Sequence, residues 1–126
     1  MHRKLATRGY DEHLINEILA ELRAKRLLSD QRFAEEYVES RVRRGYGPLR
    51  IRAELNERGI DDTLVEEVVD ANADFWQEQI AAVRKKRFGQ KSPNDFQERA
   101  KQARFLQYRG FTSDQIREAF KADVND

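Results

Sequence analysis

The chain has 126 residues and a formal net charge of +1, and 37% of its residues are charged against 39% hydrophobic. Its two prolines and six glycines are typical of exposed amphipathic helices, which argues against a sandwich or barrel and predicts the all-α class. The absence of cysteine excludes disulfides, thiolate metal sites and cysteine nucleophiles, and it suits the reducing cytoplasm. The apolar runs are far shorter than the roughly 20 residues that cross a bilayer, so we expect a cytoplasmic protein without a membrane span.

Charge is segregated along the chain. Residues 41–58 hold six arginines against two glutamates, residues 59–83 hold seven acids and no base, and residues 84–110 hold nine bases against two acids. The net charges of these blocks are therefore +4, −7 and +7. A mixed surface would average out within each block, so the alternation predicts helices that present faces of different sign. The alternative is that each block is the ordinary solvated side of a helix.

The sequence repeats itself at spacings of 50 and 51 residues. The motif Leu-x-x-Arg-Gly ends at Gly9, Gly59 and Gly110, where glycine can enter the left-handed conformation that stops a helix. After each glycine come a large apolar residue, a polar cap and, four positions later, a β-branched residue that would complete a hydrophobic staple. These residues are Tyr10, Asp11 and Ile15; Ile60, Asp61 and Val65; and Phe111, Thr112 and Ile116. Thr112 and Gln115 also have the spacing of a capping box.

The first repeat, residues 1–28, is predicted to be truncated. It contains a short helical stub over residues 3–8 and a helix over about 12–26, whose inner stripe would be Ile15, Ile18 and Leu19. The later repeats each contain three helices, so the periodicity predicts further residues upstream of the present start.

The second repeat, residues 29–73, is expected to contain helices over about 30–44, 48–58 and 62–72. Leu28 and Phe33 would form a staple around the cap Ser29, and Gly45 would end that helix. Pro48 suits the first turn of the next helix, because its missing N–H costs nothing there. The inner faces are assigned to Phe33, Tyr37, Val38, Val42, Ile51, Leu55, Val65, Val68 and Val69.

The third repeat, residues 74–126, is expected to begin with a helix capped by Asp74 and Gln77. Its second helix would open at Ser92-Pro93, and its third would run over about 113–122. The inner faces are assigned to Trp76, Ile80, Val83, Phe96, Ala100, Ala103, Leu106, Ile116, Ala119 and Phe120. Because a unit of about 50 residues buries only a modest core, we expect the tandem three-helix repeats to stack into an elongated, curved, solenoid-like array.

No arrangement of residues predicts an active site. His2 and His13 are isolated from any metal-ligand spacing, and acid pairs such as Glu35 and Glu36 point to different parts of a helix surface. The Gly45-x-Gly47 pair lacks the residues of a phosphate-binding loop. We therefore expect no catalytic residue, metal, cofactor or small-molecule substrate, and not an enzyme.

The basic clusters are the candidates for binding a partner, either through phosphates or through an acidic protein surface. Tyr46, Phe88 or Tyr108 could add stacking to phosphate contacts. The structural alternative is strongest at residues 41–44, where cations favour a helix C-terminus. The candidate partner-binding residues are Arg41, Arg43, Arg44, Arg50, Arg52, Arg84, Lys85, Lys86, Arg87, Lys101 and Arg104. Arg8, Arg58 and Arg109 belong to the repeat motif, so we expect them to cap or pair within each unit.

Two ordered motifs follow one another in the second repeat. They are Asp30-x-x-Phe33-Ala34-x-x-Tyr37-Val38-x-x-Arg41 and Gly45-x-Gly47-Pro48-x-x-Ile51-x-x-Glu54-Leu55-x-x-Arg58-Gly59-Ile60. They are preceded by Lys4-Leu5-x-x-Arg8-Gly9-Tyr10 and followed by Leu106-x-x-Arg109-Gly110-Phe111. In these residues, and over essentially the whole chain, the sequence resembles the regulatory protein RecX family, whose members have three tandem three-helix units.

The resemblance implies a modulator of the RecA recombinase. Such a protein binds the RecA filament on single-stranded DNA, lies along its groove and inhibits its ATPase, strand-exchange and co-protease activities. It would act in homologous recombination, DNA repair and the SOS response. The alternative is a direct nucleic-acid-binding helical module, motivated by the +7 block, and a weak direct contact with DNA is compatible with both. We expect a monomer that has no membrane partner.

Overall fold

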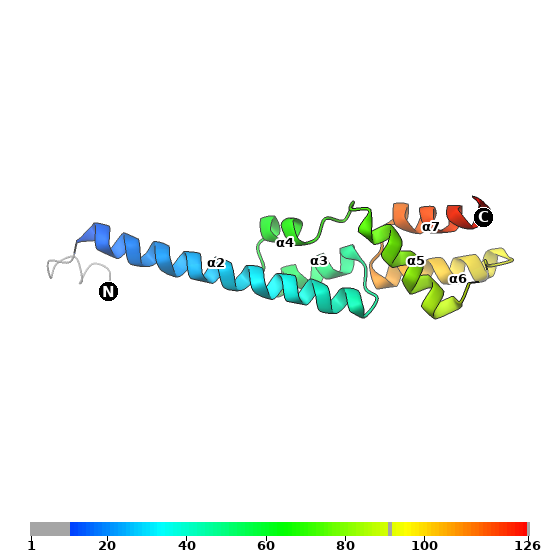
Figure 1. The fold of residues 1–126 in the computed structure, drawn as a ribbon, viewed down its shortest axis with the longest axis horizontal. Coiled ribbons are helices and arrows are strands. Elements are labelled where there is room, and N and C mark those ends of the chain that lie inside the picture. Colours follow the sequence, from blue (N-terminus) through cyan, green and yellow to red (C-terminus); the bar gives the residue numbers. More distant parts are fainter. Residues whose placement is uncertain (1–10, 91, 126) are drawn as a thin grey trace. The chain divides into compact units, whose positions relative to one another are not determined.

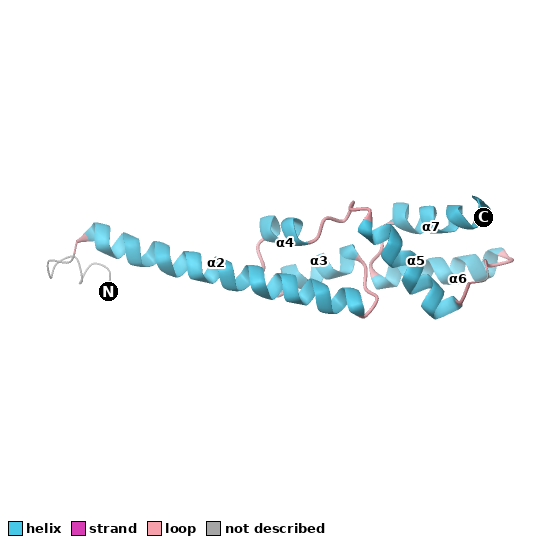
Figure 2. Cartoon of the chain, in the orientation of Figure 1, coloured by secondary structure: helices cyan, strands magenta, loops and turns pink. Residues whose placement is uncertain are grey.

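A computed structural model describes residues 11–90 and 92–125. These residues form six helices and no strand, so the prediction of the all-α class is confirmed (Figures 1 and 2). The helices are α2 (Glu12–Arg43), α3 (Pro48–Glu57), α4 (Asp62–Val68), α5 (Phe75–Phe88), α6 (Phe96–Arg109) and α7 (Ser113–Asn125). None of them is long and apolar enough to span a membrane. The chain divides into two compact units, residues 1–33 and 34–126, and each is described by itself.

The described part of the first unit is the N-terminal portion of α2. The Asp11 carboxylate accepts a hydrogen bond from the His13 backbone N–H at 2.9 Å, as expected of a cap. The predicted inner stripe is only partly correct, because Ile15 is buried whereas Ile18 and Leu19 are exposed. A single helix offers no second surface within residues 11–33 on which the full stripe could pack. The predictions for Gly9 and Tyr10 lie outside the described residues.

The helix α2 continues through the position where we predicted a break. Leu27, Leu28 and Ser29 are helical, so Ser29 is not a cap and the staple between Leu28 and Phe33 is wrong. Residues 12–43 contain neither glycine nor proline, and a continuing helix satisfies every backbone N–H that a cap would otherwise have to satisfy. A serine alone therefore does not end this helix.

The core of the second unit lies where α3, α4, α5, α6 and α7 meet the end of α2. Most of its apolar members were predicted from helical periodicity, and Trp76 also donates a hydrogen bond from Nε1 to the Asp70 carbonyl at 2.9 Å. The buried apolar residues of this core are Ala34, Ile51, Leu55, Ile60, Leu64, Val65, Val69, Trp76, Ile80, Leu106, Phe111 and Ala119.

The repeat motif forms the helix ends that its sequence predicts. Gly59 and Gly110 have φ values of +83° and +103°. The Asp61 carboxylate accepts from the Thr63 N–H at 3.1 Å. Thr112 and Gln115 form a reciprocal capping box, in which the Gln115 N–H donates to Thr112 Oγ1 at 3.1 Å and the Thr112 N–H donates to Gln115 Oε1 at 2.9 Å.

Three other helix ends differ from prediction. The helix α4 ends at Val68 instead of near 72, because Val69 is extended and the Asp70 carboxylate accepts from the Asn72 N–H at 3.0 Å in a local turn. The side chain of Asp74 does not cap α5. The helix α6 begins at Phe96 and not at Ser92-Pro93, because Asp95 caps it by accepting from the Glu98 N–H at 2.7 Å. Phe96, predicted to be internal, is 84% exposed.

Two glycines allow the backbone between α2 and α3 to touch the backbone between α6 and α7. The Gly47 N–H donates to the Arg109 carbonyl at 2.7 Å, and the Leu49 N–H donates to the Gly110 carbonyl at 2.9 Å. A Cβ atom added to Gly47 would lie 2.5 Å from the Gly110 carbonyl carbon, and one added to Gly110 would lie 2.4 Å from Arg50 Cβ. We call this contact the glycine joint.

We expect Gly47→Ala to lower the free energy of unfolding of the second unit by about 2–3 kcal/mol, because its Cβ would force two backbones apart. Gly59→Ala is the matched control, because a Cβ there meets open space and the cost is only the positive φ, about 1–2 kcal/mol. Urea unfolding measures the energies. Hydrogen exchange at the Leu49 amide should accelerate in Gly47→Ala and not in Gly59→Ala. A free energy of unfolding and an exchange rate in Gly47→Ala that both equal those of wild type would contradict the role of the glycine joint.

Candidate functional site

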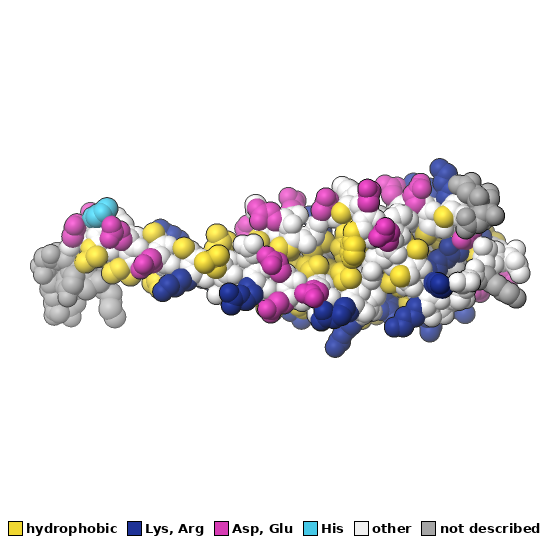
Figure 3. All heavy atoms as spheres, in the orientation of Figure 1, with side chains coloured by type: hydrophobic (Ala, Val, Ile, Leu, Met, Phe, Trp, Pro, Cys, Tyr) yellow, Lys and Arg dark blue, Asp and Glu magenta, His cyan; other side chains and the backbone are white. Residues whose placement is uncertain are grey.

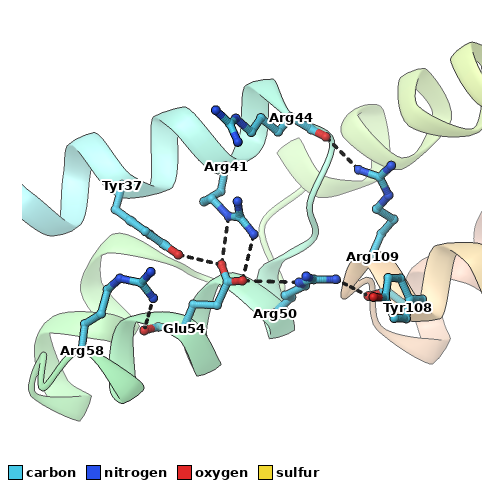
Figure 4. A network of polar contacts seen from close by, with 8 residues as sticks. All are labelled: Tyr37, Arg41, Arg44, Arg50, Glu54, Arg58, Tyr108 and Arg109. Carbon is cyan, nitrogen blue, oxygen red and sulfur yellow. Dashed lines mark hydrogen bonds and ion pairs between the residues drawn. The ribbon is translucent and has the colours of Figure 1, made fainter.

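The predicted basic residues occupy three different environments. The first is a polar network around Glu54, which joins α2 to α3 (Figure 4). The Glu54 carboxylate accepts from the Tyr37 hydroxyl at 2.9 Å and from Arg41 Nε and Nη2 at 2.9 and 2.8 Å. Arg50 Nε donates to the same carboxylate at 3.4 Å, and Arg50 Nη1 donates to the Tyr108 carbonyl at 3.3 Å. Arg41 and Arg50 therefore hold helices together.

Guanidinium groups surround the ring of Tyr46 beside this network. The Cζ atoms of Arg41, Arg50 and Arg109 lie 3.9, 4.5 and 5.0 Å from its centroid. Cation–π attraction at this range favours a planar guanidinium over the compact lysine ammonium. Tyr46, which we considered as a stacking group for a ligand, is thus already covered by side chains of the chain itself.

The network shifts the protonation equilibria of its members. Burial raises the pKa of Glu54, but the hydrogen bonds from Arg41 and Tyr37 outweigh burial and hold that pKa below its usual value. Burial and the hydrogen bond to Glu54 raise the pKa of the Tyr37 hydroxyl. Burial lowers the pKa of Arg50, yet its hydrogen bonds to Tyr108 and Glu54 produce a net rise. The ionised Glu54 carboxylate therefore accepts hydrogen bonds from two arginines and one tyrosine at once.

The second environment is the buried face of α5 and α6. Arg84 donates from Nε to Gln102 Oε1 at 2.9 Å and from Nη1 to the Ala119 carbonyl and Asp123 Oδ1 at 3.1 and 3.0 Å. Its Cζ atom also lies 4.3 Å from the ring centroid of Phe120. Arg84 thus links three helices from the inside. The burial of Gln102 was not predicted, because helical periodicity identifies apolar faces only.

The repeat-motif arginines act at helix ends, and Arg58 does so within its own repeat, as predicted, whereas Arg109 of the third repeat reaches a carbonyl of the second repeat. Arg58 Nη1 donates to the Glu54 carbonyl at 3.3 Å, and Arg109 Nη1 donates to the Arg44 carbonyl at 2.9 Å. Gln79 Nε2 donates to the Val42 carbonyl at 2.8 Å, so side chains of α5 and α6 satisfy the C-terminal carbonyls of α2. Arg8 lies outside the described residues.

The third environment is a cleft of about 390 Å³ between the end of α2, α5 and α6. The described residues that line it include five basic side chains and no carboxylate, and we call it the cationic cleft. The lining residues are Val42, Arg43, Arg44, Gly45, Gln79, Ala82, Val83, Lys86, Arg87, Phe105 and Arg109. The structure thus brings together Arg43, Arg44, Lys86 and Arg87 of the predicted set and adds Arg109. The apolar floor was not foreseen, because Val42 and Val83 were assigned to the core alone.

Most of the charge in the cationic cleft is not neutralised within the described chain. Arg43 contacts Glu39 at 3.2 Å, but both side chains are well exposed and such a pair is weak. Arg44 and Lys86 have no carboxylate within 4.0 Å among the described residues, and Arg87 lies over Phe105 at 5.4 Å. In Figure 3 many basic side chains of the second unit lie along its lower edge, and many acidic ones lie along its upper edge, where some basic ones lie as well.

The remaining candidates lie outside the cationic cleft. Arg52 contacts Glu66 at 3.4 Å, linking α3 to α4. Lys85, Lys101 and Arg104 are exposed on α5 and α6. Binding of a partner by any of these residues stays a prediction. The described residues contain no group of three side chains that could hold a metal ion.

We expect Glu54→Gln to lower the free energy of unfolding at pH 7 by about 1–3 kcal/mol, because an amide cannot match two guanidinium groups. The folded pKa of Glu54 is depressed, so its stabilisation is present above the unfolded pKa of about 4.3 and is lost as the pH falls through the folded value. Urea unfolding at pH 7 and pH 3 should show the difference from wild type shrinking in acid. The exposed neighbour Glu57→Gln is the control, and an equal effect of both variants would contradict this role.

Comparison with known proteins identifies two family domains in the chain. Residues 29–69 match the second three-helix domain of RecX, and residues 74–120 match its third three-helix domain. These matches confirm the prediction of tandem three-helix repeats. They fall on the end of α2 with α3 and α4, and on α5 with α6 and α7.

Several relatives are named Regulatory protein RecX. The protein from Halorhodospira halophila is 48% identical over 124 residues, which cover 98% of this chain and 76% of the relative. One from Pseudomonas fluorescens is 42% identical over 114 residues, covering 90% of this chain and 74% of the relative. One from Stenotrophomonas maltophilia is 37% identical over 124 residues, covering 98% and 76%. The resemblance seen in the sequence is confirmed, and the chain belongs to the regulatory protein RecX family.

Proposed function

We propose that this chain regulates the RecA recombinase by binding the RecA filament on single-stranded DNA. Binding lowers the rate of ATP hydrolysis, strand exchange and co-protease action by the filament. Membership in the RecX family is the observation that carries this proposal. The relatives are named as regulatory proteins, which agrees with a chain that acts by recognition and has no chemistry of its own.

The cationic cleft supports recognition of a negatively charged partner surface. Arg44 and Lys86 offer charges that no carboxylate of the described residues pairs with, and such charges speed encounter with an acidic surface. Arg41, Arg50 and Arg84 contribute indirectly, because their hydrogen bonds hold the helices that carry the exposed cations. The predicted basic residues therefore divide into contact groups at the surface and positioning groups inside.

Direct binding of nucleic acid is the second candidate, favoured by the +7 block over residues 84–110. Lys85, Lys101 and Arg104 are exposed on two neighbouring helices and could contact phosphates. Such binding would occur without RecA and would weaken steeply with salt. Titration of labelled single-stranded DNA with the chain at low and moderate salt measures this. A signal that does not change with salt would contradict it.

We expect the purified chain to inhibit RecA-dependent ATP hydrolysis on single-stranded DNA and to sediment with the filament. The double variant Arg44→Ser and Lys86→Ser should raise the concentration for half-inhibition about tenfold or more, equivalent to about 1.4 kcal/mol. The control double variant, Arg117→Ser and Lys121→Ser, removes the same charge from exposed positions of α7 and should inhibit like wild type. Absence of both inhibition and sedimentation at micromolar concentration would overturn the proposal.

A further inference from the structure

The cationic cleft combines an apolar surface with a basic one. Its floor is apolar and comes from Val42 on α2, Ala82 and Val83 on α5, and Phe105 on α6. Its rim is the five basic side chains already described. A site for an inorganic anion alone would not need the floor, and a purely apolar pocket would not need the rim. The cleft therefore suits a ligand that has both an apolar group and negative charge.

Hydrogen bonds made by two of the lining residues fix the walls of the cleft. Gln79 and Arg109 fix the C-terminal carbonyls of α2 against α5 and α6. Gly45 has a φ of +87°, and a Cβ added to it would lie 3.4 Å from Val83 Cγ2 and 3.5 Å from Arg109 Nη1. The missing side chain at Gly45 thus leaves space between the floor and the rim. Because Gln79 and Arg109 are already fixed, mainly the exposed basic side chains would have to become ordered when a ligand binds.

The aromatic floor is poorly suited to stacking a nucleobase. Phe105 packs against Phe88 in a T-shaped arrangement, with ring centroids 5.3 Å apart and planes at 88°. Its ring is approached by Arg87 at 5.4 Å and by Arg109 at 4.9 Å. Single-stranded nucleic acid is bound through free aromatic faces, whereas the remaining floor of alanine and valines favours a branched or aromatic side chain.

We propose that the cationic cleft binds an acidic peptide segment, with one large apolar side chain inserted between Val42 and Val83 and flanking carboxylates paired with Arg44 and Lys86. This inference rests on the proposed function, because it names the chemistry of the partner segment at the same site. Its volume of about 390 Å³ lies at the small end of ligand pockets, which fits one anchoring side chain and not a whole folded surface.

Fluorescence anisotropy with labelled peptides tests the inference without RecA. The probe Gly-Glu-Asp-Phe-Glu-Asp-Gly should bind, and replacing its phenylalanine by alanine should weaken binding about tenfold or more through lost apolar burial. Replacing its acids by the matching amides should also weaken binding, and added salt should weaken the acidic probe alone. Equal binding of the phenylalanine and alanine peptides, or tighter binding of a short labelled oligothymidylate, would overturn it.

Two neighbouring alanines of α5 give matched variants. Ala82 lines the cationic cleft and Ala81 does not, and both are exposed, so glutamine at either position leaves the helix intact. Ala82→Gln should abolish binding of the peptide while Ala81→Gln should not, with circular dichroism confirming equal helix content. Equal binding by the two variants would overturn the placement in the cleft. Peptide binding without RecA inhibition would count against the proposed function alone, and inhibition without peptide binding against this inference alone.

Discussion

The second unit depends on one place where two backbones touch. At the glycine joint, hydrogen bonds of 2.7 and 2.9 Å connect the turn before α3 to the end of α6. This approach brings Arg109 to the last carbonyls of α2 and Arg50 to the carbonyl of Tyr108. It also sets the distance between α2 and α6, and hence the width of the cationic cleft. The turn before α3 and the end of α6 are therefore coupled through main chain within this unit.

Arginine side chains in this fold either hold helices together or face solvent, and the two groups differ in burial. The side chains of Arg41 and Arg84 are 17% and 12% exposed and each makes several charge-assisted hydrogen bonds. Removing Arg84 would leave the partly buried Asp123 carboxylate without this guanidinium, and removing Arg41 would leave Glu54 with only Tyr37 and the longer contact to Arg50. Breaking such a pair costs more than the pair contributes when intact. Arg44 and Lys86, in contrast, reach solvent beside apolar surface. A chain with many basic residues can therefore have a small recognition surface, because many of its cationic side chains form hydrogen bonds and ion pairs inside the fold.

The sequence predicted the parts of this structure that depend on neighbours along the chain. The positive φ of Gly110, the capping box of Thr112 and Gln115, and the burial of Ile51 all follow from local spacing. The sequence did not predict features that depend on residues far apart in the chain. Periodicity does not reveal the hydrogen bond between Arg84 and Gln102. No motif shows that Val42 and Val83 line the same cleft. The continuity of α2 was missed for another reason. A good cap residue permits a helix to begin but does not force the preceding helix to end.

Trp76 has a consequence for how this molecule can be observed. It is the sole tryptophan of the chain, and it is 3% exposed in the core of the second unit, with its indole N–H held by the Asp70 carbonyl. The fluorescence of this tryptophan therefore reports the melting of residues 34–126, whereas far-ultraviolet circular dichroism reports all helices together. If the exposed leucine-rich length of α2 in the first unit frays at lower temperature, the two optical transitions will separate. Tryptophan fluorescence and far-ultraviolet circular dichroism of one unlabelled sample can therefore distinguish the melting of the two units.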